Sequence, residues 1–383
     1  MPVRERGDVT PIPLAQLTTL RTGGAPARMI DAATRDEIIA ALREVWSTGD
    51  PWFVLGGGSN LFVGDEPFDG TVVRVLTQGI ERMPSPTPGR ARLRVQAGHD
   101  WDALVGYAVA EGLGGIEAMS GIPGTVGAAP VQNIGAYGQE IVQTLAEVEL
   151  IDESTGEIST VPAAELGLGF RTSVLKHHYG SAPERRAVIL SVTLDLAEVG
   201  PGGRRIAGDQ LRTALRLAAD DEVTLAWVRE RILATRRSKG MVLDADDPDT
   251  WSAGSFFQNA VVSASFARTL PGECPRWPVA PDLDPVLVIP LASFDGYVPP
   301  PAATESDVKV SAAWLIEHAG VRKGFKLPRS RAAVSSKHAL ALTNRGNATA
   351  AELAELARFI QGRVQSEFGL ILQPEPVLVD VEL

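Results

Sequence analysis

A serine placed between a glycine and two aromatic residues is the first candidate for chemistry in this chain. It lies in Gly254-Ser255-Phe256-Phe257-Gln258-Asn259, a few residues after the acidic run that contains Asp244 and Asp249. Glycine lets a ligand approach the backbone, and two phenylalanines can keep water away from a small polar group. The same pattern is also typical of a core strand in which Ser255 is a small polar residue with satisfied hydrogen bonds. Both interpretations are open on these residues alone.

Two glycine-rich stretches are candidates for ligand loops. Gly56-Gly57-Gly58-Ser59-Asn60 follows an apolar segment, and successive backbone N–H groups at a strand end form a nest that suits a phosphate. It matches neither GxxxxGK[ST] nor GxGxxG, and a structural hairpin turn is the alternative. Residues 121–138 have almost no charge and no periodicity, so we expect a ligand loop there rather than a passive connector.

Basic residues occur in two places that suit an anionic substrate. One is the apolar segment from Phe170 to Lys176, which contains Arg171 and ends in His177-His178. The histidine pair has no Cys or carboxylate at metal-ligand spacing, so we expect it on the surface. The other is Arg236-Arg237-Ser238-Lys239, which also suits the dipole at the end of a helix. The single cysteine, Cys274, excludes an intramolecular disulfide and a CxxC site, and we predict no metal.

The elements that must position these residues alternate between strands and helices. Capping boxes at Thr34–Glu37 and Thr349–Glu352 predict helix starts, and apolar residues recur at helical spacing in other segments. We predict helices after Asp100, over 222–239, over 311–318 and from 349 to 367. We predict strands over 27–30, 51–55, 71–75, 91–97, 148–152, 188–196, 336–344 and 377–381, and a loop over 199–208.

Composition limits the class of protein. The 383 residues are enough for two or three domains, and a net charge of −11 argues against wholesale binding to nucleic acid or an anionic membrane. We find no apolar N-terminal run and no apolar stretch near ~20 residues, so we expect a cytoplasmic protein without a membrane span.

Eight separate runs, in order and from about Leu17 to the C-terminus, resemble the UDP-N-acetylenolpyruvoylglucosamine reductase family. They are Arg21–Gly24, Gly56–Asn60, Gly121–Gly138, Phe170–Lys176, Lys239–Asp244, Gly254–Asn259, Ser311–Gly320 and Gln373–Glu375. The resemblance implies an α+β fold with a two-subdomain FAD-binding region of the vanillyl-alcohol-oxidase (PCMH) type and a C-terminal UDP-sugar domain. We expect subdomain 1 over 1–76, joined by the strand 378–383, subdomain 2 over 77–240, and the substrate domain over 241–377. Such a fold would explain the missing GxGxxG pattern.

The resemblance also implies the reaction. The family uses NADPH and FAD to reduce UDP-N-acetylglucosamine-enolpyruvate to UDP-N-acetylmuramate in peptidoglycan precursor synthesis, a step in cell wall biogenesis that underlies cell shape and cell division. Hydride would pass from N5 of reduced FAD to the vinyl carbon, and Ser255 would supply the proton. Arg171 matches the arginine that would hold the substrate carboxylate, and Glu375 matches the glutamate beside it. FAD would be non-covalent because no His or Cys lies near the loop 56–60, and we expect a monomer.

The remaining site residues are carried over by position. The FAD contacts would be Gly56, Gly57, Gly58, Ser59, Asn60, Gly121, Gly124, Thr125, Gly127, Gly135 and Tyr137. The substrate contacts would be Arg171, Lys239, Asn259, Tyr137 and His318. For His318, a plain position on a helix surface is the alternative.

The chain departs from the family pattern at one loop. Many members carry a tyrosine that closes over the substrate where Ile206-Ala207 stand here, and the four tyrosines of this chain lie elsewhere. Two other functions stay open: another FAD oxidase or dehydrogenase of the same fold, and a UDP-sugar-binding protein without catalysis. The first would account for the glycine loops but not for Arg171, Ser255 and Glu375 together.

Overall fold

The computed structural model describes residues 7–206, 208–279 and 307–383. Its first sheet contains β1 (Asp8–Val9), β2 (Pro26–Ala32), β5 (Phe68–Val75) and β3 (Trp52–Leu55), in that order. The pairs β2–β5 and β5–β3 are parallel, so the chain must cross over between strands, and α1 (Arg35–Thr48) makes one crossover. The capping box predicted at Thr34 is present, and Gly49 ends the helix at φ +73°.

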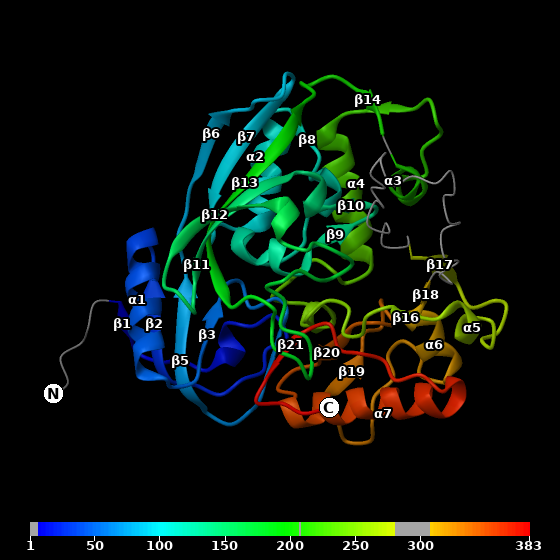
Figure 1. Cartoon of the computed structure of the whole chain (residues 1–383). Coiled ribbons are helices and arrows are strands. Elements are labelled where there is room, and N and C mark those ends of the chain that lie inside the picture. Colours follow the sequence, from blue (N-terminus) through cyan, green and yellow to red (C-terminus); the bar gives the residue numbers. More distant parts are fainter. Residues whose placement is uncertain (1–6, 207, 280–306) are drawn as a thin grey trace, which may run out of the picture.

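The second sheet is antiparallel and is the largest in the molecule's described part. Its order is β12 (Ile158–Pro162), β11 (Leu145–Asp152), β13 (Ala187–Glu198), β7 (Arg90–Gln96) and β6 (Ile80–Pro84), with β8 (Leu113–Gly114) beside β13. Figure 1 shows α2 (Trp101–Ala110) and α4 (Leu225–Ser238) packed together next to this sheet. Asp100 caps α2, and Thr224 caps α4.

One continuous core joins the two sheets. On α1, Ile38, Leu42 and Val45 are almost completely buried and belong to the same cluster as Leu93 of β7 and Leu194 of β13. Fully burying one such side chain contributes about 1.5–3 kcal/mol. Trp46, which the helical spacing also placed inward, is only partly buried at the edge of this core.

The stretch between α2 and β11 is built from short turns rather than one open loop. It contains the single-turn 3-10 helices η2 (Glu117–Met119), η3 (Val126–Ala128), η4 (Pro130–Gln132) and η5 (Ile141–Gln143). A two-residue hairpin, β9 (Gly135–Ala136) with β10 (Gln139–Glu140), places Tyr137 in the turn at φ +54°.

The segment 199–208 was predicted as a loop, and the structure corrects part of it. Arg204–Arg205 form the short strand β14, which pairs with β15 (Glu222–Val223), and α3 (Asp209–Leu215) follows. Ile206 is buried in a small apolar cluster with Leu211 of α3 and Val228 of α4. Ala207 lies outside the described residues.

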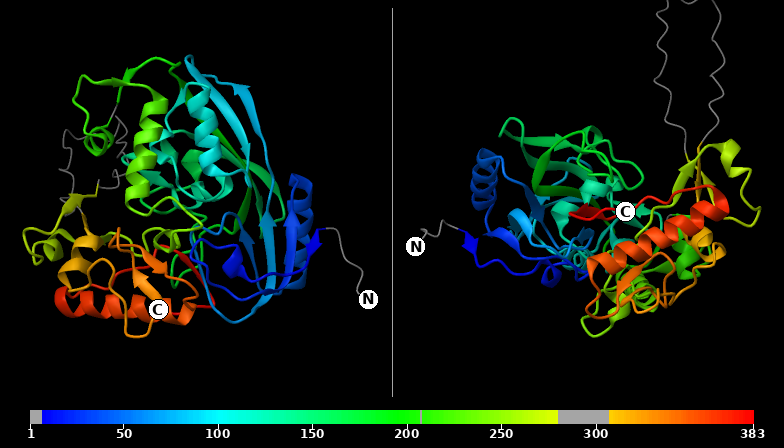
Figure 2. Two further views of the ribbon diagram at one scale, coloured as in Figure 1. Left: turned by 180° about the vertical axis from the view of Figure 1, so that it is seen from behind. Right: turned by 90° about the horizontal axis from the view of Figure 1, so that it is seen from below.

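The C-terminal region has its own core. It contains β16 (Ala260–Val262), α5 (Ala264–Ala267), β17 (Arg276–Pro278), β18 (Val308–Val310), α6 (Ala312–His318), β19 (Ala332–Val334), β20 (Leu342–Asn344) and α7 (Ala350–Phe368). Leu353, Leu356 and Ile360 of α7 are fully buried in that core. The views in Figure 2 place α7 and α1 on opposite sides of the molecule. Most of the span 271–301, whose role the sequence left open, lies outside the described residues.

The last strand returns to the N-terminal region, whereas one predicted strand is shorter than expected. β21 (Val377–Val379) pairs in parallel with β4 (Leu61–Val63), directly after the loop 56–60. Residues 336–344 were predicted as a strand, but only Leu342–Asn344 are extended. The correction has a local cause: Ser335 Oγ accepts hydrogen bonds from the backbone N–H groups of Lys337 and His338 and holds a turn there.

No helix in the described ranges is both long and apolar enough to cross a bilayer.

Candidate active site

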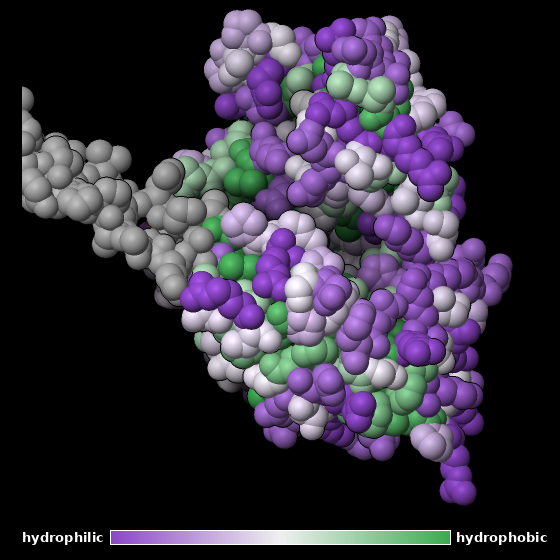
Figure 3. All heavy atoms as spheres, turned by 90° about the vertical axis from the view of Figure 1, so that its right-hand side faces the viewer, coloured by the Kyte–Doolittle hydropathy of each residue, from purple (hydrophilic) through white to green (hydrophobic). Residues whose placement is uncertain are grey.

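A cavity of about 490 Å³ lies where the glycine loops, the Arg171 segment and the serine stretch meet. The space-filling view in Figure 3 shows a recess between the upper and lower parts of the molecule on a mostly hydrophilic face. The residues that line the cavity include Gly56–Asn60, Gly124, Thr125, Gly127, Gln132, Gly135, Arg171, Lys176, Arg236, Gly254, Ser255 and Glu375. Elements far apart in the sequence therefore converge on one space.

The loop 56–60 needs its glycines because it packs directly against the loop that contains Gly124. A Cβ on Gly57 would lie 2.7 Å from the Cα of Gly124, and one on Gly56 would lie 2.5 Å from the Thr125 hydroxyl. Gly58 has φ +60°, and its Cβ would lie 2.0 Å from the Leu17 carbonyl oxygen. Side chains are therefore excluded here, and the two loops expose backbone to the cavity.

The backbone N–H groups of this loop are available to a ligand. Over the described residues, no protein group accepts a hydrogen bond from the N–H of Gly57, Gly58, Ser59 or Asn60. Meanwhile the Ser59 hydroxyl donates to the Pro123 carbonyl at 2.9 Å, which fixes one loop against the other. Consecutive free N–H groups form an anion-binding nest, and they fit the pyrophosphate of a dinucleotide cofactor.

Arg171 and Glu375 face each other in the cavity. Arg171 Nε lies 3.2 Å from Glu375 Oε1, and Arg171 Nη2 donates to the Gly135 carbonyl at 3.1 Å. The Arg171 backbone has φ +55°, a left-handed conformation that is uncommon outside glycine and that turns the segment into the cavity. Burial raises the pKa of Glu375, and the charges of Arg171 and Lys176 oppose that shift.

The serine stretch is tied directly to the strand end that carries Glu375. Glu375 N donates to the Phe256 carbonyl at 2.9 Å, and Gln258 N donates to the Gln373 carbonyl at 3.0 Å. Gly254, at φ +76°, makes the turn before Ser255. Ser255 is partly buried, and its hydroxyl has no hydrogen-bond partner within the described part of the chain. The hydroxyl and the carboxylate thus come from segments joined by backbone hydrogen bonds.

The two phenylalanines do not line the cavity. Phe256 and Phe257 are each 1% exposed and belong to the C-terminal core, where the Phe256 ring packs edge-on against Phe62 at 5.6 Å. The expectation that they wall the serine off from water is therefore wrong. Instead, their burial anchors the backbone directly after Ser255 and so holds Ser255 at the cavity.

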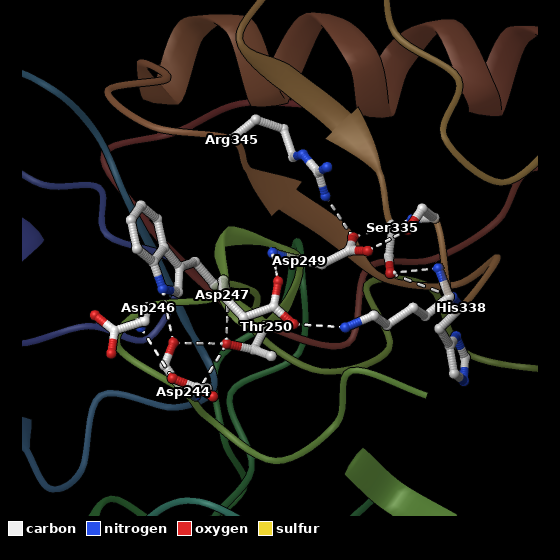
Figure 4. A network of polar contacts seen from close by, with 11 residues as sticks. Asp244, Asp246, Asp247, Asp249, Thr250, Ser335, His338 and Arg345 are labelled. Carbon is white, nitrogen blue, oxygen red and sulfur yellow. Dashed lines mark hydrogen bonds and ion pairs between the residues drawn. The ribbon is translucent and has the colours of Figure 1, made fainter. Parts of the chain in front are cut away.

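The loop before Ser255 is held by a buried aspartate, as Figure 4 shows. Asp249 Oδ1 accepts from Ser336 N at 3.0 Å and pairs with Arg345 Nη1 at 2.6 Å, and its Oδ2 accepts from the Ser336 hydroxyl. Burial acts to raise the pKa of Asp249, but these hydrogen bonds and the Arg345 charge lower it overall. In addition, Lys337 Nζ pairs with Asp247 Oδ2 at 2.5 Å. The loop is therefore clamped to the turn at Ser335.

Lys239 and Tyr137 lie close to each other beside the cavity. Lys239 is exposed at the end of α4, and its Nζ lies 5.8 Å from the Tyr137 ring centroid. Burial raises the pKa of the Tyr137 hydroxyl, and Arg236 opposes the shift. Gly121 packs against α4, where a Cβ would meet Leu233 at 2.8 Å. None of these three residues lines the cavity, so their contacts with cofactor and substrate stay predictions.

Asn259 and His318 make contacts within the C-terminal region. Asn259 Oδ1 accepts from the N–H of Ala312, the first residue of α6, at 3.0 Å. His318 is exposed and stacks on Trp314, with ring centroids 3.7 Å apart. For both, a structural contact accounts for the side chain, and their predicted role toward the substrate is untested.

Sequence reasoning missed buried basic residues that line the cavity. Lys176 is 3% exposed and donates to Gln132 Oε1 at 3.1 Å and to the Glu375 carbonyl at 3.0 Å. Arg236 is 9% exposed and donates to the Met241 carbonyl at 2.9 Å. The signal for Lys176 was its position directly after the apolar residues Val174 and Leu175. Arg236 was missed because the helix dipole already explained a basic residue at the end of that helix. Of the histidine pair, His177 is exposed as predicted and His178 is half-buried.

The described ranges contain no cluster of three His, Cys, Asp or Glu side chains suited to a metal ion. A glycine cradle with N–H groups free among the described residues, next to an arginine and a buried carboxylate, suits a dinucleotide cofactor. The model of the FAD binding domain matches residues 26–161. The fold and this site therefore place the chain among FAD-binding oxidoreductases, with an α+β fold as expected.

The second half of the chain identifies the family. Residues 246–379 match the UDP-N-acetylenolpyruvoylglucosamine reductase C-terminal domain. The reductase of Leifsonia xyli is 54% identical over 97% of this chain and 99% of its own length, and that of Saccharopolyspora erythraea is 46% identical over 97% and 95%. The crystal structure of the Thermus caldophilus reductase superposes with a TM-score of 0.58 at 26% identity, covering 97% of this chain and 98% of that one. The chain belongs to the UDP-N-acetylenolpyruvoylglucosamine reductase family.

Proposed function

We propose that this chain uses NADPH to reduce UDP-N-acetylglucosamine-enolpyruvate to UDP-N-acetylmuramate, in the cytoplasm and as a monomer. The observation that carries the proposal is the meeting of Arg171, Glu375 and Ser255 at one cavity beside the glycine cradle. The family membership supports the same substrate. FAD, held through the backbone N–H groups of Gly57–Asn60, would supply hydride transfer when bound.

Arg171 and Glu375 act on the substrate carboxylate. Addition of hydride to the vinyl carbon places negative charge next to that carboxylate, and a guanidinium fork is the natural partner for its two oxygens. Burial favours the protonated form of Glu375, and in that form it donates a hydrogen bond to a carboxylate oxygen. The pair would therefore stabilise the charge that develops in the transition state.

Ser255 supplies the last proton, to the carbon next to the carboxylate. A hydroxyl is a weak acid, and it serves only when the acceptor is as basic as an enolate and a nearby cation offsets the alkoxide. Ser255 has no competing hydrogen-bond partner among the described residues. Lys239 is the cation proposed to offset the negative charge of the Ser255 alkoxide. Asn259, Tyr137 and His318 are proposed to contact the substrate.

The test is a spectrum of the purified protein in three steps. We expect bound flavin absorbance, bleaching by NADPH without oxygen, and reoxidation when UDP-N-acetylglucosamine-enolpyruvate is added, with one product formed per NADPH consumed. Rapid oxidation by oxygen without that substrate would indicate a different flavin oxidase of this fold. A colourless protein that binds UDP-sugars would indicate a binding protein and overturn the proposal.

A further inference from the structure

Lys176 has no role in the reaction proposed above, yet it is the most buried cation at the cavity. Its side chain is 3% exposed, and its Nζ donates to two acceptors, Gln132 Oε1 at 3.1 Å and the Glu375 main-chain carbonyl at 3.0 Å. Burying an ammonium group is costly unless it is hydrogen-bonded. A surface lysine would avoid this cost, so the position calls for a reason beyond packing.

Both acceptors of Lys176 are shared with the cofactor loop. Asn60 Nδ2 donates to the same Gln132 Oε1 at 2.8 Å and approaches the same Glu375 carbonyl at 3.4 Å. The Asn60 carbonyl in turn accepts from Val377 N at 2.9 Å. The main chain around Glu375 is therefore fixed to the glycine loop at two points and to the Arg171 segment at one.

From these contacts we infer that Lys176 is a positioning residue for Glu375, holding its main chain so that its carboxylate stays paired with Arg171 at the cavity. The inference rests on the proposed function. The backbone N–H of Glu375 donates a hydrogen bond to the Phe256 carbonyl. The main chain of Glu375 is therefore held from both the cofactor side and the serine side. Without Lys176, only the long Asn60 contact would hold the carbonyl from the cofactor side.

Charge gives Lys176 a second effect on the same residue. Burial lowers the pKa of Lys176 to about 8, with Glu375 opposing the shift and Arg171 adding to it. Below pH 8 the lysine is charged and favours the ionised form of Glu375. Arg171 is the other charged group that acts on both Lys176 and Glu375. On the same segment lies His178, whose pKa is lowered by burial and by the charge of Lys176.

The experiment compares Lys176→Met with Lys326→Met, which removes an exposed lysine far along the chain. Both are prepared as flavin-loaded enzymes, and kcat and kcat/KM are measured from pH 5 to pH 10. We expect Lys176→Met to lower kcat by about 10-fold or more, because a displaced catalytic group loses that much. We also expect the pH limb that reports Glu375 to move up by about one unit, since a lost positive charge favours the protonated carboxyl.

Each outcome decides the inference. Lys326→Met should match the parent enzyme in both respects. A Lys176→Met profile that is uniformly lower but unshifted, or that is unchanged, overturns it. If Lys176→Met does not fold or loses flavin, Lys176→Arg keeps the charge but replaces the ammonium with a longer, planar donor that cannot occupy the same position. That variant should lower kcat about 10-fold with the Glu375 pH limb unshifted, and an unchanged kcat would overturn the inference. A parent enzyme inactive on the substrate would instead refute the proposed function.

Discussion

The two sides of the cavity differ in composition: main-chain groups form the cofactor side, and side chains form the reaction side. The cofactor side is made of backbone: Gly56 and Gly57 pack against Thr125 and Gly124, Gly58 packs against Leu17, and the N–H groups of Gly57 and Gly58 have no protein acceptor among the described residues. The reaction side is made of side chains, with Arg171, Ser255 and Glu375 brought from three separate segments. A backbone site is sensitive to any added atom, whereas a side-chain site is sensitive to the identity and position of single groups.

This difference predicts that the two sides fail in different ways. Damage to the glycine cradle should remove the cofactor and with it all activity. Damage to the reaction side should leave the cofactor bound and stop only the step that its side chains serve. Ser255→Ala and Gly57→Val test that separation, and Asp249→Asn and His338→Gln test the stability of the turn that holds the loop before Ser255.

Ser255→Ala should have the largest effect on turnover and none on the cofactor. Losing a positioned proton donor typically costs about 10²–10⁴-fold in rate. We expect NADPH to bleach the flavin at the parent rate, and the enolpyruvyl substrate to reoxidise it about 1000-fold more slowly in stopped-flow measurements. Normal product formation by this variant would remove Ser255 from the mechanism and break the comparison.

Gly57→Val should abolish flavin retention, because its Cβ would lie 2.7 Å from the Cα of Gly124 and would force the loops apart. We expect at least about 100-fold weaker binding, on the order of 3 kcal/mol, measured as flavin absorbance per protein after gel filtration. Gly202→Val is the matched control, since nothing lies within 4 Å of a Cβ there. Full flavin content in Gly57→Val would show that the cradle is not the cofactor site.

Asp249→Asn should weaken the clamp that holds the loop before Ser255. The carboxylate is buried and pairs with Arg345 and Ser336, and charged hydrogen bonds of this kind contribute about 2 kcal/mol. We expect a loss of that size in the free energy of unfolding from urea titration, with flavin content unchanged. Asp36→Asn is the control because Asp36 is 95% exposed, and its Arg35 contact is 3.7 Å long. Equal losses in the two variants would contradict the clamp.

His338→Gln should change only the pH dependence of stability. Burial lowers the pKa of His338 to about 4, below its ordinary 6.5, with Lys239, Lys323 and Arg236 adding to the shift. The unfolded chain therefore takes up a proton as pH falls below 6.5 while the folded chain does not, so the stability falls. From pH 6.5 to 5.5 this loss is about 1 kcal/mol, and the variant should lack it. Parallel unfolding free energies across that range would show that His338 is accessible when folded.

Much of the local structure could be predicted because it depends on neighbouring residues. The capping boxes at Thr34 and Thr349, the cap at Asp100 and the glycine that ends α7 all act within one helical turn. The predicted strand over 336–344 was too long because the Ser335 hydroxyl competes for the backbone N–H groups of the turn. Such a competition depends on geometry that periodicity does not encode.

The amino-acid sequence by itself determined the glycine loops, the order of helices and strands, and the motifs that predicted the family. These follow from residue types and short spacings, which constrain backbone conformation directly. Only the tertiary structure decided which side chains meet. It brought Lys176 to Glu375 across 199 positions, placed the Phe256 and Phe257 rings in the core, and joined β21 to β4 beside the cradle. Contacts between such distant segments depend on how the sheets and cores pack, because a buried charge or strand edge finds its partner only when the whole chain is folded.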